Sequence, residues 1–354
     1  MILAIERLRN SEWALVVLSL VLCALGSPNA LGGTARPALA SEELMSSQAQ
    51  IANPGDEILL ISTRKVGTVC NGDAMSSRLQ CKQYVSTTAH KSQWISRDWQ
   101  TLVTSATATR PTVIYIHGNR VSRGEDRSQG MQIYRSLTRL RKFNEPIRFI
   151  IWSWPSAAIP GPIKDYKVKA RRTRPAAWQL AWFLDRLPPQ THVSLLGYSY
   201  GARVASGALH VLGGGSLGGL KLDQRIHPQH QPFRMALMAA AFDADWIQPG
   251  HFHAQTLSQV ERLVIVTNHL DPIMRFYHLS NGRGRVHALG KNGIAQPRTL
   301  GSARRSIKMI DFTYAVGRNH ALVNYLAASG KMRSIWQELL MPDTSARHSS
   351  LSIN

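Results

Sequence analysis

A serine between two glycines, placed after an apolar run and before a helix-like segment, restricts the fold of this chain more than any other feature. Residues 193–196 have the composition of a buried strand, residues 197–201 read Gly-Tyr-Ser-Tyr-Gly, and residues 202–211 have the pattern of a helix. A sharp strand-to-helix turn of this kind exposes a serine hydroxyl above the end of a sheet, where a base can activate it. Because glycine has no side chain, the two glycines permit the strained turn and the close packing behind it. Ser199 is the candidate nucleophile.

A second strand-like run, residues 112–116, ends in His117-Gly118-Asn119-Arg120. The tetrahedral intermediate of acyl transfer carries a negative oxygen, and each backbone N–H aimed at it can contribute about 3 kcal/mol. We expect the backbone amides of Asn119 and Tyr200 to be these oxyanion donors. His117 is expected to brace the loop rather than to react.

A base and an orienting acid follow in the chain order Ser, Asp, His. Asp271 comes just after the buried-strand pattern of residues 262–267, and His320 lies between the strand pattern of residues 307–312 and a helix-like segment. Functional groups of open α/β sheets gather at the carboxyl ends of the strands. We therefore expect His320 to be the base and Asp271 its acid.

Other residues compete for these two roles. Asp243 and Asp245 also follow an apolar strand, so the acid could come from there instead of from position 271. The histidines at 278, 287 and 348 are also downstream of the serine, but none of them directly follows a strand and opens a helix. Asp311 lies inside its strand pattern and is expected to be a strand-end hydrogen-bonding residue.

Four short motifs stand in a fixed order along the chain: ISTR at 61–64, HGN at 117–119, SWPS at 153–156 and GYSYG at 197–201. In these motifs the chain resembles an uncharacterised bacterial group of serine hydrolases within the α/β-hydrolase superfamily. The resemblance covers about residues 57 to 330. It implies the same catalytic set, Ser199, Asp271 and His320 with oxyanion donors at Asn119 and Tyr200, and it leaves the substrate open.

The resemblance implies the α/β-hydrolase fold. The periodicity of apolar residues is consistent with it, because it predicts a mostly parallel central sheet of about eight strands with helices on both faces. The two earliest strands are expected to be antiparallel, because only a short loop joins them. Strands are expected near 57–62, 82–88, 112–116, 147–152, 192–196, 234–239, 262–267 and 307–312, and helices near 126–141, 175–186, 200–211, 254–260, 320–328 and 331–340.

The first forty residues have the composition of a secretory signal peptide. Arg7 and Arg9 precede an apolar stretch from Trp13 to Leu25, and Ala-Leu-Ala at 38–40 offers a cleavage site. The apolar stretch is shorter than the roughly 20 residues that a membrane-spanning helix needs. We expect a signal peptide at 1–40, a flexible polar lead at 41–56, one catalytic domain at 57–340, a disordered tail at 341–354, and no permanent membrane span after cleavage.

Export would place the chain in an oxidising compartment, namely the periplasm, the cell surface or the extracellular medium. Cys70 and Cys81 lie close together in the sequence, flanked by strand-like stretches. We expect them to form a disulfide bond, with two unrelated buried thiols as the alternative.

The chain carries 42 Lys and Arg against 21 Asp and Glu, a formal net charge of +21. Such a charge attracts polyanions. The basic stretches at 164–174 and 283–305 contain few aromatic residues, so specific nucleic-acid binding is not expected. A solvated basic face is one interpretation, and non-specific attraction to acidic envelope polymers is the other.

The stretch at 154–162 follows a buried strand and is rich in proline, so we expect it to line the substrate cleft with Trp154 as a wall. No metal site and no cofactor are expected, because the close histidine pairs lack accompanying carboxylates and no phosphate-binding glycine pattern follows a strand. The sequence predicts a secreted serine hydrolase that cleaves small-molecule or lipid carboxylic esters, or related acyl groups, through an acyl-enzyme. An acyltransferase with the same residues, or a non-catalytic module that binds acidic envelope polymers, are the alternatives.

Overall fold

A computed structural model of the chain describes residues 52–86, 92–106, 110–141, 145–275, 277 and 286–340. The predicted signal peptide, the predicted polar lead up to residue 51 and the predicted tail lie outside these residues. The last residues of the lead are held in place, because the Tyr134 hydroxyl accepts from the Asn53 amide at 3.0 Å and donates to Asp56 at 2.7 Å. Within the described residues, no helix combines the length and apolar character that a bilayer crossing requires.

One sheet organises the described chain, and its strand order is β3-β2-β1-β5-β4-β6-β7-β8-β9. Every neighbouring pair from β1 to β9 is parallel, whereas β2 and β3 are antiparallel additions at one edge. The strands are β1 (Glu57–Ser62), β2 (Gln80–Ser86), β3 (Ser92–Arg97), β4 (Thr112–Ile116), β5 (Arg148–Ser153), β6 (Val193–Tyr198), β7 (Phe233–Met238), β8 (Val260–Thr267) and β9 (Ile307–Asp311).

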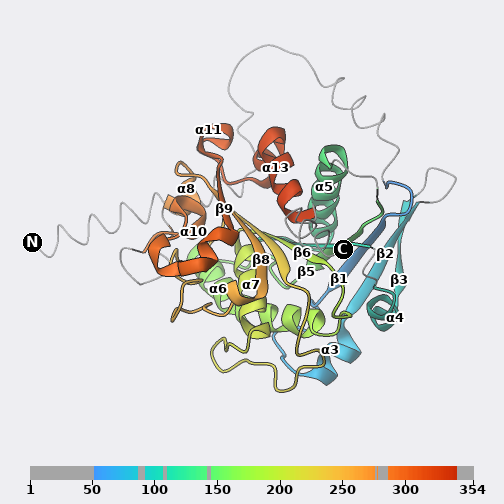
Figure 1. Cartoon of the computed structure of the whole chain (residues 1–354). Helices are drawn as coiled ribbons and strands as arrows, with labels where there is room; N and C mark the ends of the chain where they lie inside the picture. Colours follow the sequence, from blue (N-terminus) through green and yellow to red (C-terminus); the bar gives the residue numbers. More distant parts are fainter. Residues whose placement is uncertain are drawn as a thin grey trace, which may run out of the picture.

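Helices cover both faces of this sheet. Alternate strand residues point to opposite faces. Ile114 and Ile116 of β4 pack in one core with α6 (Pro162–Leu184) and α7 (Tyr200–Leu212), while Val113 and Tyr115 pack in the other with α5 (Glu125–Leu140) and α13 (Ser329–Leu340). Figure 1 shows α5 and α13 together on one side of the sheet and α6 and α7 together on the other. The predicted mostly parallel sheet with helices on both faces is confirmed, as is the antiparallel pairing of the first two strands.

The helices agree with the prediction where apolar spacing is regular. The long ones are α5 (Glu125–Leu140), α6 (Pro162–Leu184), α7 (Tyr200–Leu212) and α13 (Ser329–Leu340). The expected helix at 254–260 is only a 3₁₀ turn, η1 (Leu257–Gln259). The shorter helices are α3 (Gly72–Arg78), α4 (Trp99–Thr104), α8 (Pro272–Arg275), α10 (Leu289–Asn292), α11 (Thr313–Val316) and α12 (Leu322–Ala327), with a second 3₁₀ segment, η2 (Pro297–Ser306).

Helix α6 begins thirteen residues before the prediction, at Pro162 instead of Pro175. Both prolines suit the first turn of a helix, where no backbone N–H is needed, and the sequence alone favoured the second. The structure places Pro162 at the helix start and Pro175 inside the helix.

The predicted disulfide is wrong. Cys70 and Cys81 are both free thiols, and the short helix α3 lies between them in the chain. The Cys70 sulfur faces the backbone carbonyls of Thr68 and Pro175, whereas Cys81 is buried within β2. Burial raises the pKa of each thiol to about 12, so both remain protonated and unreactive at neutral pH.

Candidate active site

Ser199 occupies the turn between β6 and α7, at the carboxyl end of the central strand. Its backbone lies at φ 53° and ψ −116°, a conformation that L-residues rarely adopt. The Ser199 amide donates to the carbonyl of Met238 at 2.9 Å, which ties the turn to the end of β7. The strained backbone holds the side chain at the sheet edge.

The second glycine of the turn is required by close packing. A Cβ atom built on Gly201 would lie 2.0 Å from the Ile116 carbonyl oxygen and 2.7 Å from that of His117. No side chain fits at such distances, so helix α7 can start directly behind β4 only with glycine there. The pentapeptide therefore forms the predicted turn for a steric reason.

The structure brings the three predicted residues together. The His320 Nε2 atom lies 3.1 Å from the Ser199 hydroxyl oxygen, and the His320 Nδ1 atom lies 2.7 Å from a carboxylate oxygen of Asp271. A carboxylate can only accept, so Nδ1 carries the ring proton and Nε2 is left to accept from the serine. Ser199 and Asp271 are buried and His320 is partly exposed.

Asp271 is held by three further donors. The backbone amides of Ile273 and Met274 donate to its Oδ1 atom at 2.9 and 3.2 Å, and the Tyr325 hydroxyl donates to Oδ2 at 3.2 Å. Burial, reinforced by the Asp271 charge, raises the pKa of Tyr325, so this phenol remains a donor. The sequence did not predict this role for Tyr325, because nothing but its position five residues after His320 marks it.

The loop that carries His320 is fixed by a buried amide and a tyrosine. The Asn268 side chain donates to the carbonyls of Gly317 and Asn319 at 2.9 and 3.3 Å. The Tyr198 hydroxyl donates to the backbone carbonyl of His320, and the two rings pack with their centroids 5.6 Å apart. The His320 loop is therefore held by one residue at the end of β6, Tyr198, and by one directly after β8, Asn268.

The loop after β4 lies against the nucleophile. A Cβ on Gly118 would come within 3.2 Å of the Ser199 Cβ, which places the following residue, Asn119, next to the turn. Tyr200 is the first residue of α7, where backbone amides have no partner within the helix. The role of these two amides as oxyanion donors stays a prediction.

His117 supports this loop. Its Nε2 atom accepts from the Trp154 amide at 3.2 Å, so the proton sits on Nδ1, which donates to the Gly118 carbonyl at 2.9 Å. Burial lowers the pKa of His117 to about 4, so the ring is neutral.

The structure contradicts the prediction that Trp154 is a wall of the cleft. Its side chain is fully buried. The indole stacks on His117 and donates to the His117 carbonyl at 2.8 Å. Trp154 follows β5 at its carboxyl end, as expected, but it packs beneath the loop after β4 instead of facing solvent.

A buried carboxylate that the sequence did not reveal ties this loop to α6. Asp165 accepts from the Asn119 side chain at 3.3 Å, from Arg120 at 3.1 Å and from the Ile159 amide at 3.0 Å. Lys169, itself fully buried, donates to it at 2.8 Å. The basic stretch at 164–174 is thus not wholly solvated, because one of its cations lies inside the domain.

The competing residues are placed elsewhere. The His251 Nδ1 atom lies 3.2 Å from a carboxylate oxygen of Asp245, and Asp243 is buried beside Tyr277. Asp311 caps the turn that follows β9 by accepting from the Thr313 amide at 2.8 Å. His287 is exposed, while His278 and His348 lie outside the described residues. Among the described residues, His, Cys, Asp and Glu form no group of three that could hold a metal ion.

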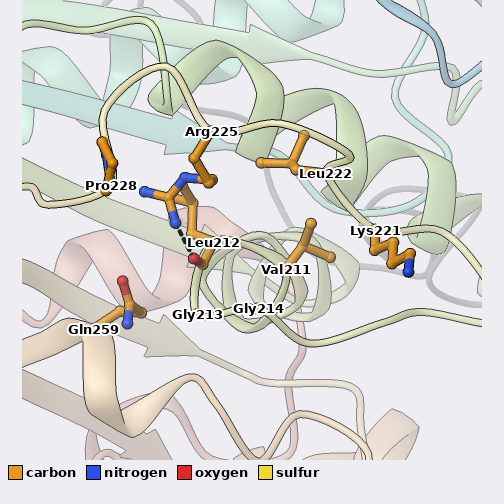
Figure 2. Close-up of a pocket in the computed structure, with 9 residues that line it drawn as sticks. All are labelled: Val211, Leu212, Gly213, Gly214, Lys221, Leu222, Arg225, Pro228 and Gln259. Atoms are coloured by element: carbon orange, nitrogen blue, oxygen red, sulfur yellow. Dashed lines mark hydrogen bonds between the residues drawn. The ribbon is translucent and has the colours of Figure 1, made fainter.

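A pocket at the far end of α7 is shown in Figure 2. Gly213 and Gly214 end the helix there, and Arg225 donates to the Leu212 carbonyl and pairs with Asp185. A helix rises 1.5 Å per residue, so this pocket is about 20 Å along α7 from Ser199. It is remote from the candidate active site.

Comparison with known proteins gives only distant likenesses. No family model and no curated protein matches the chain. Similar solved structures include esterase B from Lactobacillus rhamnosis (13% identity, 89% of this chain and 97% of that chain, TM-score 0.37). Another is carboxyl esterase 2 from Tuber melanosporum, with 14% identity over 86% of this chain and 100% of that chain and a TM-score of 0.36. A third is an IroE-like serine hydrolase from Shewanella oneidensis, with 12% identity over 74% of this chain and 78% of that chain and a TM-score of 0.34. Likeness at this level leaves the predicted membership of the bacterial group with HGN, SWPS and GYSYG motifs a prediction.

Proposed function

We propose that the protein is a serine hydrolase that cleaves carboxylic esters or related acyl groups. The observation that carries the proposal is the continuous hydrogen-bonded series from Ser199 through His320 to Asp271, at 3.1 and 2.7 Å. A serine, a base and an orienting carboxylate within such distances are the parts of an activated nucleophile.

In the proposed reaction, His320 Nε2 takes the Ser199 proton as the oxygen attacks the substrate carbonyl. The backbone amides of Asn119 and Tyr200 hold the resulting oxyanion, and Asp271 stabilises the imidazolium. The imidazolium then protonates the leaving alcohol, which departs and leaves an acyl-serine. Water, deprotonated by His320, releases the acid and restores the serine.

The same residues would serve an acyltransferase if another acceptor displaced water from the acyl-enzyme. Hydrolysis is the simpler proposal, because His320 is partly exposed and water can reach it. A purely binding role is less well supported, because Tyr325, Asn268 and two backbone amides all act to position Asp271 or His320, and a binding module has no need of them.

We also propose that the chain is exported, on the composition of residues 1–40 alone. The free thiols of Cys70 and Cys81 lend this part no support. Mass spectrometry of the protein recovered from a producing cell tests it. A mature chain that starts at Ser41 in the envelope or medium is expected, and an intact Met1 chain in the cytoplasm would contradict it.

The decisive experiment is labelling with a fluorophosphonate, followed by mass spectrometry of the modified peptide. We expect a saturable adduct on Ser199 and none on the Ser199→Ala variant. Ser206 is a matched control, because its hydroxyl also contacts a histidine, His253, at 2.8 Å but is fully buried. Ser206→Ala should label like the unmodified protein. A folded protein that forms no adduct on Ser199 would overturn the proposal.

A further inference from the structure

Two arginines approach each other beside the turn that carries Ser199. Arg203 lies on the first turn of α7, and Arg174 lies on α6, which packs along it. The Arg203 guanidinium carbon is 4.4 Å from the ring centroid of Trp246, and that of Arg174 is 5.4 Å from the ring centroid of Phe252. The two aromatic rings are themselves in contact, with centroids 4.7 Å apart.

Neither guanidinium has an anionic partner among the described residues. Within the part of the chain that the structure describes, no ion pair and no hydrogen bond engages Arg174 or Arg203, and the Nε atom of Arg203 is buried without an acceptor. Arg174 is exposed and Arg203 is partly buried, so the argument depends on the Arg203 Nε atom, because a buried polar nitrogen is normally hydrogen-bonded. Desolvation, with a further contribution from the Arg203 charge, lowers the pKa of Arg174.

The surroundings leave this pair with an excess of positive charge. His253 contributes no compensating or further charge, because burial holds its pKa well below the usual value and the ring is neutral. Asp243 interacts with the Tyr277 hydroxyl, a group whose pKa the Arg203 charge also affects. The two guanidiniums are therefore available to an anionic ligand.

The pair is close to the candidate nucleophile. Arg203 is four residues after Ser199 and lies on the first turn of α7, directly after the turn that carries the serine. Helical side chains lean toward the helix N-terminus, and Arg203 does so, since its guanidinium carbon lies 5.8 Å from the Tyr200 ring centroid. An anion bound by Arg203 would sit within one helical turn of the reacting centre.

We propose that Arg203, assisted by Arg174, binds a carboxylate or phosphate group of the substrate and makes the enzyme selective for anionic esters. This inference rests on the proposed function of Ser199. The guanidinium donates two parallel hydrogen bonds to either oxyanion, and the group that it holds positions the ester carbonyl over the serine.

A row of exposed cations on α6 leads to this pair. Lys164, Lys167 and Arg171 precede Arg174 at alternating spacings of three and four residues, so all four share one face of the helix, and all are exposed. Such a row raises the local concentration of an anionic substrate and speeds its encounter with the site.

The test compares two 4-nitrophenyl esters of similar size, a neutral butyrate and an anionic hemisuccinate. We expect the unmodified protein to have the higher kcat/KM on the hemisuccinate. Arg203→Met keeps the packing on Trp246 and should lower the hemisuccinate-to-butyrate ratio of kcat/KM about 10- to 100-fold. Arg203→Lys should restore part of the ratio, and added salt should reduce it in the unmodified protein.

Arg186→Met is the matched control, because Arg186 also lies over a tryptophan, Trp182, at 3.4 Å but at the far end of α6. It should leave the ratio unchanged. A ratio that Arg203→Met does not alter would overturn the inference and leave the proposed hydrolase intact.

Calorimetric titration of succinate and of inorganic phosphate into the Ser199→Ala protein tests the site without chemistry. Binding of either anion that Arg203→Met abolishes would support it, and the tighter anion would identify the group in the substrate. Failure of both anions to bind would overturn the inference. Anion binding with no hydrolysis and no fluorophosphonate adduct would instead reject the proposed function.

Discussion

Replacement of Lys169 by methionine should be one of the most destabilising single changes in the domain. Lys169 and Asp165 form an ion pair at 2.8 Å with side-chain exposures of 0% and 1%. Removal of one member of a buried pair costs about 3–5 kcal/mol, because the other charge is left buried. In the variant, Asp165 keeps its contacts with Arg120 and with the Ile159 amide. We therefore expect the free energy of unfolding to fall by about 3 kcal/mol, the low end of that range.

Urea unfolding followed by tryptophan fluorescence measures this loss as a lower midpoint with an unchanged slope. Lys167→Met is the control, since Lys167 lies on the same helix but is exposed, and it should change stability by less than about 0.5 kcal/mol. The double variant Asp165→Leu/Lys169→Met should recover part of the loss, because no unpaired charge remains.

The pH dependence gives an independent check. Burial opposes ionisation of Asp165, but hydrogen bonds from Lys169 and the Ile159 amide outweigh it and hold the pKa of this carboxyl below 3.8. A depressed pKa stabilises the fold above the unfolded value, and this contribution is lost as the pH falls through the folded pKa. In Lys169→Met the loss should begin at higher pH. Equal stabilities of Lys169→Met and Lys167→Met at pH 7 would refute this reasoning.

Three further changes test other parts of the site. Gly201→Ala should destabilise the protein by more than about 3 kcal/mol in a urea titration, because its methyl group would overlap a backbone carbonyl at 2.0 Å. The control Gly330→Ala should be nearly neutral, because its methyl group meets no atom within 4 Å. Equal losses of stability in the two variants would contradict the steric account. Tyr325→Phe removes one donor to Asp271, so it should lower stability by about 1.5–3 kcal/mol and also lower kcat on a neutral ester. Unchanged stability and kcat would show that the 3.2 Å hydrogen bond contributes to neither. The pKa of His117 is about 4 in the folded protein against an ordinary value of 6.5, so the free energy of unfolding should fall by about 3 kcal/mol as the pH drops from 6.5 to 4. His117→Gln should flatten that part of the pH–stability profile. A flat profile in the unmodified protein would exclude a neutral, buried His117 ring.

The sequence predicts the parallel part of the fold well, because each central strand is an uninterrupted apolar run and each long helix has a regular apolar face. Strand β3 was missed, since Ser92–Arg97 is polar apart from Trp94 and Ile95 and depends on pairing with β2. Helix α3 was missed for a related reason. It is only seven residues long, and its start depends on Asn71, which accepts from the Ala74 amide at 2.8 Å.

For the site, the order of motifs was enough to predict which serine, histidine and aspartate would meet, because the carboxyl ends of parallel strands share one edge of a sheet. The supporting residues could not be predicted in this way. Tyr325, Asn268 and Asp165 act through contacts with residues between 40 and 60 positions away, and no local pattern distinguishes them from ordinary surface residues. Trp154 was misplaced because sequence shows that a residue follows a strand, but not which way its side chain turns.

The position of Tyr325 has a consequence for how the protein is made. The donors around Asp271 come from residues 273, 274, 320 and 325, so two of them are synthesised more than 100 residues after the turn at Ser199. A growing chain can complete β6 and the turn at Ser199 while the histidine is still missing. Ser199 therefore has no base until the segment with residues 320 and 325 packs on the sheet. A nascent or truncated chain that ends before residue 320 can form the turn, but it lacks the His320 contact that would activate the serine.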